Sequence, residues 1–112
     1  MKTPFLITIA LTLSVILSSH AIAGPMPSEL EAKGISAMES GAYEDAEQIF
    51  RELIGLRPKS FVGHYNLAAA HSMQGEVEEA IDAMSTALAL GFCDKAQMYR
   101  DPDLKVLRLD PW

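Results

Sequence analysis

Two stretches of the chain repeat one pattern: GAYEDAEQIF begins at residue 41, and GEVEEAIDAM begins at residue 75. An offset of 34 residues aligns identical residues, namely Gly41 with Gly75, Glu44 with Glu78, Ala46 with Ala80, and Leu56 with Leu90. Where identity fails, size and polarity agree, since Phe50 aligns with Met84. A repeat of this length is one supersecondary unit that cannot bury its apolar face alone, so the units must stack to form a core.

Each unit is predicted to be a pair of helices. Apolar residues at spacings of three and four predict helices over residues 28–39, 44–57, 60–74 and 76–90. Ser28 and Glu31 predict a capping box at the first helix. Pro58 stops the second helix because it lacks an amide donor, and Gly91 suits the left-handed residue that follows a helix end.

The apolar pattern resembles that of the tetratricopeptide repeat family, with residues 27–60 as one unit and 61–94 as the next. The match is carried by Gly34, Tyr43, Ala46, Phe50 and Pro58 in the first unit, and by Leu67, Ala68, Gly75, Ala80 and Ala87 in the second. The resemblance implies an all-α fold, a right-handed superhelical stack of helix-turn-helix hairpins. The chain departs from the pattern at His71, where an aromatic residue is common, and at Phe92, where a closing proline is usual.

The last unit, residues 95–112, does not repeat the pattern and is predicted to be a degenerate cap that shields the second repeat from water. Residues 94–100 suit a short helix, and Asp101 can cap a following one. We expect Leu104 and Leu107 to face the core, Arg108 to pair with a nearby acid, and Trp112 to close the end.

Residues 1–23 have the layout of a secretory signal peptide. Lys2 precedes an apolar run, and Ala21 and Ala23 occupy the positions that a signal peptidase reads, so cleavage is expected before Gly24. A retained membrane anchor is the alternative, although the apolar run is short for a bilayer, which needs about 20 residues. The chain is therefore predicted to be exported, periplasmic or secreted, with a short linker over 24–27, a repeat domain over 28–112, and no membrane contact after cleavage.

The formal net charge is −6, and the cations are scattered along the chain. Binding to nucleic acid or to anionic lipid, which needs a basic surface, is therefore not predicted. The single cysteine, Cys93, cannot form a disulfide within the chain. We expect it to be a half-buried small apolar residue, with pairing to another chain as the alternative.

Few residues suit catalysis or metal binding. His64 and His71 are seven residues apart on one helix, so they share a face, yet neither a carboxylate nor a third histidine has ligand spacing nearby. The methionines are scattered, Cys93 has no partner for redox chemistry, and no nucleophile motif surrounds any serine. No enzyme activity and no cofactor are predicted. A metal (copper or zinc) or redox carrier that uses His64, His71, the methionines or Cys93 is the alternative function.

The family resemblance implies a concave groove lined by the first helix of each pair, which receives a peptide or a partner helix. Carried over residue by residue, the groove candidates are Glu31, Ile35, Met38, Val62, Tyr65, Asn66, Ala69, Met73 and Arg100. Tyr65 is the expected aromatic anchor. The predicted function is non-catalytic protein–protein interaction, as a scaffold or an accessory subunit of an envelope complex, with self-association as a way to complete so short a stack.

Overall fold

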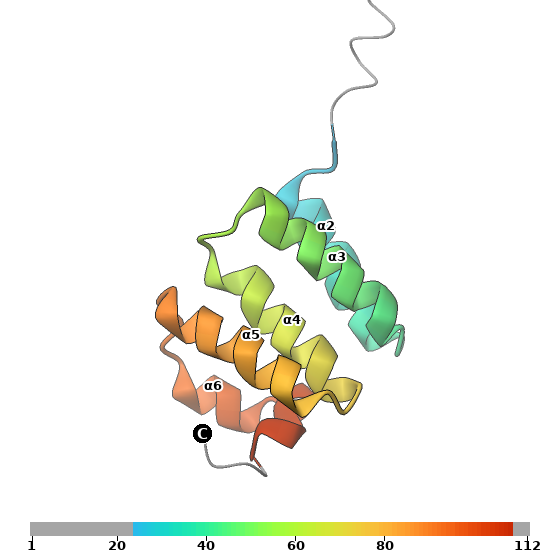
Figure 1. The fold of residues 1–112 in the computed structure, drawn as a ribbon. Coiled ribbons are helices and arrows are strands. Elements are labelled where there is room, and N and C mark those ends of the chain that lie inside the picture. Colours follow the sequence, from blue (N-terminus) through green and yellow to red (C-terminus); the bar gives the residue numbers. More distant parts are fainter. Residues whose placement is uncertain (1–23, 109–112) are drawn as a thin grey trace, which may run out of the picture.

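The computed structural model describes residues 24–108, which form six helices in sequence order and no strand. The helices are α2 (Pro27–Glu39), α3 (Tyr43–Leu56), α4 (Phe61–Met73), α5 (Val77–Ala89), α6 (Lys95–Arg100) and the 3₁₀ segment η2 (Pro102–Arg108). α2 packs on α3 and α4 packs on α5, as two antiparallel hairpins, and α3 packs on α4 to join them (Figure 1). The predicted all-α stack of hairpins is confirmed. The predicted signal peptide lies outside the described residues.

The two hairpins turn in the same way because each turn places a glycine in the left-handed region. Gly41 has φ of 80° and Gly75 has φ of 75°. In both turns the amide after the glycine donates to a carbonyl five residues earlier: Ala42 to Ala37 at 2.9 Å, and Glu76 to His71 at 3.0 Å. These bonds satisfy carbonyls that the helix end leaves open, so the sequence repeat is also a repeat of backbone geometry.

The start of α2 differs from the prediction. The helix begins at Pro27, and the Glu29 carboxylate accepts a hydrogen bond from the backbone amide of Met26 at 3.2 Å. The expected capping box of Ser28 and Glu31 is therefore wrong. Proline at the first helical position explains the shift, because its φ suits a helix and its missing amide would have no partner there.

The core follows the repeated positions. Phe50 and Met84, which align at the repeat offset, are both fully buried. Gly34 is required beside Phe50, because a β-carbon at residue 34 would lie 2.6 Å from Cζ of that ring. α4 is the central helix, covered by α3, α5 and η2, and its residues from Leu67 to Ser72 are all buried. Stacking of the second hairpin on the first thus supplies the core that one hairpin lacks.

The described part of the C-terminal segment packs on the second repeat. The Asp94 carboxylate accepts from the Gln97 amide at 2.9 Å at the start of α6, and η2 packs on α4 and α5. Leu104 and Leu107 are buried, as expected. Arg108 does not pair with an acid: it donates to the carbonyl oxygens of Tyr99 at 2.6 Å and Asp101 at 3.3 Å. These contacts fix the chain reversal between α6 and η2. Trp112 lies outside the described residues.

Candidate functional site

The groove candidates of the first repeat follow one stripe of α2. Glu31, Ile35 and Met38 recur at spacings of four and three, which places them on one helix face. Ile35 is 42% exposed, and Glu31 and Met38 are half-buried. A large apolar side chain therefore remains accessible on the first helix of the stack.

The candidates on α4 form a second stripe, Val62, Asn66, Ala69 and Met73, at spacings of four, three and four. Met73 is 37% exposed and Ala69 is buried. The structure brings the two stripes together at their N-terminal ends, where Glu31 and Val62 line one hollow of about 100 Å³ with Arg57 and Ser60. The face formed by α2 and α4 is thus continuous at this end.

Tyr65 does not lie open on this face. It is 7% exposed, its ring centroid is 4.7 Å from that of Phe92, and its hydroxyl donates to Asp101 Oδ2 at 2.7 Å. Burial, with the hydrogen bond to Asp101 as the next cause, raises the pKa of the Tyr65 phenol. The cap covers this residue, so a partner would meet the Tyr65 ring only if the cap moved. The role of Tyr65 as anchor stays a prediction.

Phe92 also contacts Tyr65, and no role in this contact was predicted for it from the sequence. It stands where the family pattern closes a repeat with proline, and its ring packs between Tyr65 and Phe61, whose centroid is 5.6 Å away. The departure from the pattern was the available signal, because a large aromatic residue at a closing position needs a surface to pack on. Phe92 and Asp101 together attach the cap to α4.

Arg100 lies at the other edge of the cap, exposed, in a shallow depression that Asp94, Gln97 and Asp101 also line. No residue of α6 is buried, so this depression lies on the surface of the C-terminal segment. Glu31 and Val62 thus line one hollow, and Arg100 lines another.

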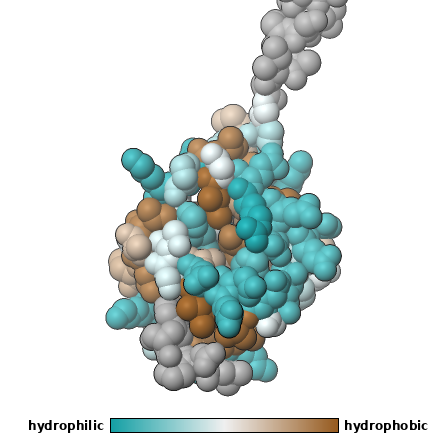
Figure 2. Space-filling view, in the orientation of Figure 1, coloured by the Kyte–Doolittle hydropathy of each residue, from teal (hydrophilic) through white to brown (hydrophobic). Residues whose placement is uncertain are grey.

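The surface over α3 is hydrophilic, whereas hydrophobic residues gather near the C-terminal end of α5 (Figure 2). Glu44 and Asp45 lie in the first turn of α3, where acids complement the helix dipole, and both are exposed. The outer face of the first repeat is thus a solvated acidic surface.

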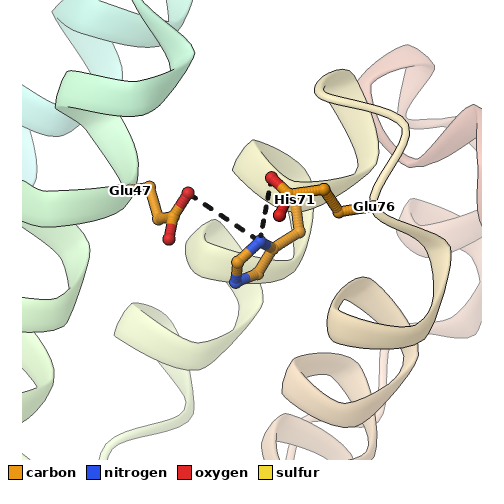
Figure 3. A group of neighbouring side chains, drawn as sticks. All are labelled: Glu47, His71 and Glu76. Carbon is orange, nitrogen blue, oxygen red and sulfur yellow. Dashed lines mark ion pairs between the residues drawn. The ribbon is translucent and has the colours of Figure 1, made fainter.

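The histidines do not act together. His64 Nε2 lies 3.1 Å from the carbonyl oxygen of Pro58, whereas His71 is buried two turns further along α4, about 10 Å away at 1.5 Å per residue. His71 is instead close to two carboxylates, those of Glu47 on α3 and Glu76 just before α5 (Figure 3). Two carboxylates therefore lie near His71 in the fold, although no carboxylate has ligand spacing from the histidines along the chain.

A signal for this group was present in the repeat. His71, Glu76 and Glu47 align at the 34-residue offset with Ala37, Ala42 and Ile81. Each of the three polar residues thus stands where the other repeat has an apolar one. Spacing along the chain could not show the convergence, because Glu47 reaches His71 only when the two hairpins stack.

Cys93 is a free, exposed thiol. The expectation of a half-buried residue is wrong, because Cys93 lies in the loop after α5, where the neighbouring Phe92 takes the buried position. Met84 is fully buried in the core, and Met38 and Met98 pack against it. These side chains do not gather with the histidines into one soft-metal site in the described part of the chain.

A family model described as tetratricopeptide repeat matches residues 37–98, more than half of the chain. The chain belongs to the tetratricopeptide repeat family. A curated relative, a chloroplastic protein of Arabidopsis thaliana, is 32% identical over 79 residues, which cover 68% of this chain and 24% of the relative. The chain thus spans about a quarter of that relative's length. No solved structure matches the chain.

Tetratricopeptide repeats generally mediate protein–protein interaction and are typically non-catalytic. Among residues 24–108, no helix is long and apolar enough to cross a membrane. Membership in the family therefore makes a protein partner the first ligand to consider for the face formed by α2 and α4.

Proposed function

We propose that the chain, once exported, is a non-catalytic protein-binding module, a scaffold or accessory subunit of a cell-envelope complex. Its partner would supply an extended peptide or a helix to the face formed by α2 and α4. The family supports the class of function, and the remaining support comes from the exposed side chains of this face.

The observation that carries the proposal is the exposure of Ile35 and Met73. Large hydrophobic side chains exposed within residues 24–108 are Met26, Ile35, Leu56, Phe61, Met73 and Tyr99. Ile35 and Met73 lie on the first helices of consecutive repeats, on the two stripes of groove candidates. Apolar side chains left in water on a structured helix face are suited to bury a partner's apolar anchor.

The dimensions limit the ligand. α2 and α4 have 13 residues each, so the face is about 20 Å long at 1.5 Å per residue. An extended peptide rises about 3.3 Å per residue, which leaves room for a segment of roughly six residues. The net charge of −6 favours a segment with basic residues, whose association would slow as salt is added.

Affinity capture with matched variants tests the proposal. The full chain is expressed in a host that processes any leader, and it is used as bait on an envelope extract. The test variant is Ile35→Asp with Met73→Asp, and the control is Leu56→Asp, since Leu56 is an exposed apolar residue on α3, 50% accessible. Circular dichroism confirms that both variants are folded.

A partner retained by the native chain and by the control, but lost by the test variant, supports the α2–α4 face. A partner held equally by all three proteins would refute the choice of face. The identified partner is then divided into short peptides, and fluorescence anisotropy at two salt concentrations measures which segment binds and whether charge contributes.

Export is tested separately. Fractionation of the native host, with N-terminal sequencing of the recovered protein, is expected to give an envelope fraction and a chain that begins at Gly24. A cytoplasmic chain that retains residues 1–23 would contradict the envelope assignment without affecting the binding face.

A further inference from the structure

Three side chains from both hairpins converge beside α4: Glu47 of α3, His71 of α4, and Glu76 in the turn before α5 (Figure 3). His71 is 3% exposed, and its Nδ1 atom is buried without a hydrogen-bond partner. This atom lies 3.6 Å from Glu76 Oε1 and 3.9 Å from Glu47 Oε2. A buried imidazole nitrogen is thus aimed at two carboxylates that it does not reach.

The other ring nitrogen is accounted for. Arg51 Nη2 lies 3.4 Å from His71 Nε2, and a guanidinium can only donate. In the neutral tautomer that carries its proton on Nδ1, this proton faces the two carboxylates and the unprotonated Nε2 faces the guanidinium, at a distance that is itself long for a hydrogen bond. The distances from Nδ1 to Glu76 Oε1 and to Glu47 Oε2 both exceed the 2.7–3.2 Å of an N–H···O hydrogen bond. A proton on Nδ1 therefore forms no good hydrogen bond with either carboxylate.

The same distances suit a metal ion. A tetrahedral Zn²⁺ holds nitrogen and oxygen ligands about 2.0–2.2 Å from itself, which places neighbouring ligand atoms roughly 3.4 Å apart. One ligand atom from each of Glu47, His71 and Glu76 lies within 4.8 Å of the other two. An ion at their centre would require the separations between the three ligand atoms to shorten by up to about 1.4 Å, which rotation of the glutamate side chains can supply.

We propose that Glu47, His71 and Glu76 bind one divalent first-row transition ion, with Zn²⁺ as the best fit, and that the ion joins the two hairpins. Imidazole and carboxylate together suit borderline ions of this class. The Glu76 side chain is 38% exposed, so water can complete the coordination from the open side. Because the ligands come from α3, α4 and the start of α5, a bound ion stabilises the stacked state.

Neighbouring groups already orient one ligand. Arg51 Nη2 donates to Glu47 Oε1 at 2.8 Å, and Gln74 Nε2 donates to Glu47 Oε2 at 3.0 Å. These two hydrogen bonds lower the pKa of Glu47, so its carboxylate is ionised near neutral pH. Groups that hold a ligand in this way strengthen metal sites.

Binding changes one contact. Coordination through Nδ1 moves the ring proton to Nε2, which then faces the Arg51 guanidinium, another donor. The Arg51 side chain is 55% exposed, so its guanidinium can rotate away from Nε2 while it keeps its hydrogen bonds to Glu47 Oε1.

Calorimetric titration with ZnCl₂ tests the proposal on the full chain, expressed without a histidine tag and stripped with a chelator. The decisive variant is Glu76→Gln, because the only polar contact of the Glu76 side chain within the described residues is with His71. Its matched control is Glu79→Gln, the same change of charge at an exposed residue in the first turn of α5. A Glu47→Gln variant repeats the test from the other hairpin.

We expect one Zn²⁺ per native chain and per Glu79→Gln chain, with affinity on the order of tenfold or more lower in the Glu76→Gln and Glu47→Gln variants. At a free zinc concentration one hundred times the dissociation constant, the ratio of folded to unfolded chains rises about 100-fold. That rise is measured as a higher Tm, and Glu76→Gln should reduce the increase in Tm by about half or more.

Cobalt substitution identifies the ligands. Co²⁺ bound at this site should give visible ligand-field absorption that is present in the Glu79→Gln protein and lost in the Glu76→Gln protein. Equal zinc affinity in the native and Glu76→Gln proteins would overturn the proposal, as would the absence of stoichiometric binding. The test does not require a His71 variant. If such a variant failed to fold, the comparison of Glu76→Gln with Glu79→Gln would still decide between the outcomes.

Discussion

Replacement of Gly34 by alanine tests the close packing of α2 on α3. A β-carbon at residue 34 would lie 2.6 Å from Phe50 Cζ, whereas non-bonded carbons prefer about 3.5–4.0 Å. The Phe50 side chain is fully buried, so its ring cannot turn aside without disturbing its neighbours. Overpacking of this kind costs about 1–3 kcal/mol.

A second effect acts in the opposite direction. Alanine in the middle of a helix is favoured over glycine by about 0.5–1 kcal/mol. The packing effect is the larger of the two, so the net expectation is a loss of roughly 1–2 kcal/mol in the free energy of unfolding. For a domain of this size, each kcal/mol corresponds to about 4–8 °C in Tm.

Gly55 provides the matched control. It is exposed in α3, and nothing lies within 4 Å of a β-carbon built there. Gly55→Ala therefore receives only the helical benefit, and we expect it to stabilise the fold by up to about 1 kcal/mol. Urea unfolding followed by far-ultraviolet circular dichroism measures both variants, which should differ in sign.

A double variant locates the cause of the loss. Phe50→Leu leaves a cavity when introduced alone, and the methyl group of Gly34→Ala would partly fill it, so the two losses should add to less than their sum. If Gly34→Ala instead stabilised the protein as much as Gly55→Ala does, the register of α2 against α3 would be incorrect.

The remaining predictions concern the cap. Tyr65→Phe removes the hydrogen bond to Asp101 and should cost about 1–2 kcal/mol, with faster hydrogen exchange of the α6 and η2 amides; unchanged exchange would argue against the attachment. Because the folded-state pKa of Tyr65 is raised above the unfolded value of about 10, its contribution to stability is present below about pH 10 and lost as the pH rises further. Equilibrium unfolding at several alkaline pH values should show this loss in the native chain and less of it in Tyr65→Phe. Leu104→Ala, at a fully buried residue, should cost about 2–5 kcal/mol, whereas Lys105→Ala beside it should change the unfolding free energy by less than about 0.5 kcal/mol. Equal effects of the two changes would show that η2 does not pack on the core.

The elements of the fold that depend on local rules were predictable from the sequence. Helix ends at Gly41, Pro58 and Gly75 follow from backbone geometry, and the burial of Phe50 and Met84 follows from the repeat. The cap was predicted from the helix signals of residues 94–107 and from the need to shield the last repeat from water. The first helix start was misplaced because Pro27 favours the first helical position and Ser28 favours the capping position just before a helix, so the two adjacent residues indicate different starts.

The candidate site was less predictable, because it depends on contacts between distant segments. Tyr65 was expected to be an open anchor, and whether it is open depends on where residues 92–101 fold back. The approach of Glu47 to His71 depends likewise on how α3 and α4 stack. Ile35 and Met73 could be assigned to the right stripes from periodicity, because helical spacing places them there whatever the neighbouring helices do.

The differences between the repeats are more informative about function than their agreement. Agreement at Ala46 and Ala80, both fully buried, is what stacking requires of any such pair. His71 stands opposite Ala37 in the alignment, so the fold does not need a polar group there, and a buried nitrogen without a hydrogen bond lowers stability. A group that packing does not require and that lowers stability when unpaired is best explained by a ligand that pairs with it. Because that ligand would lie between the hairpins and a protein partner would lie on the face of α2 and α4, the two can act together: an ion that sets how the hairpins stack also sets the spacing of Ile35 from Met73.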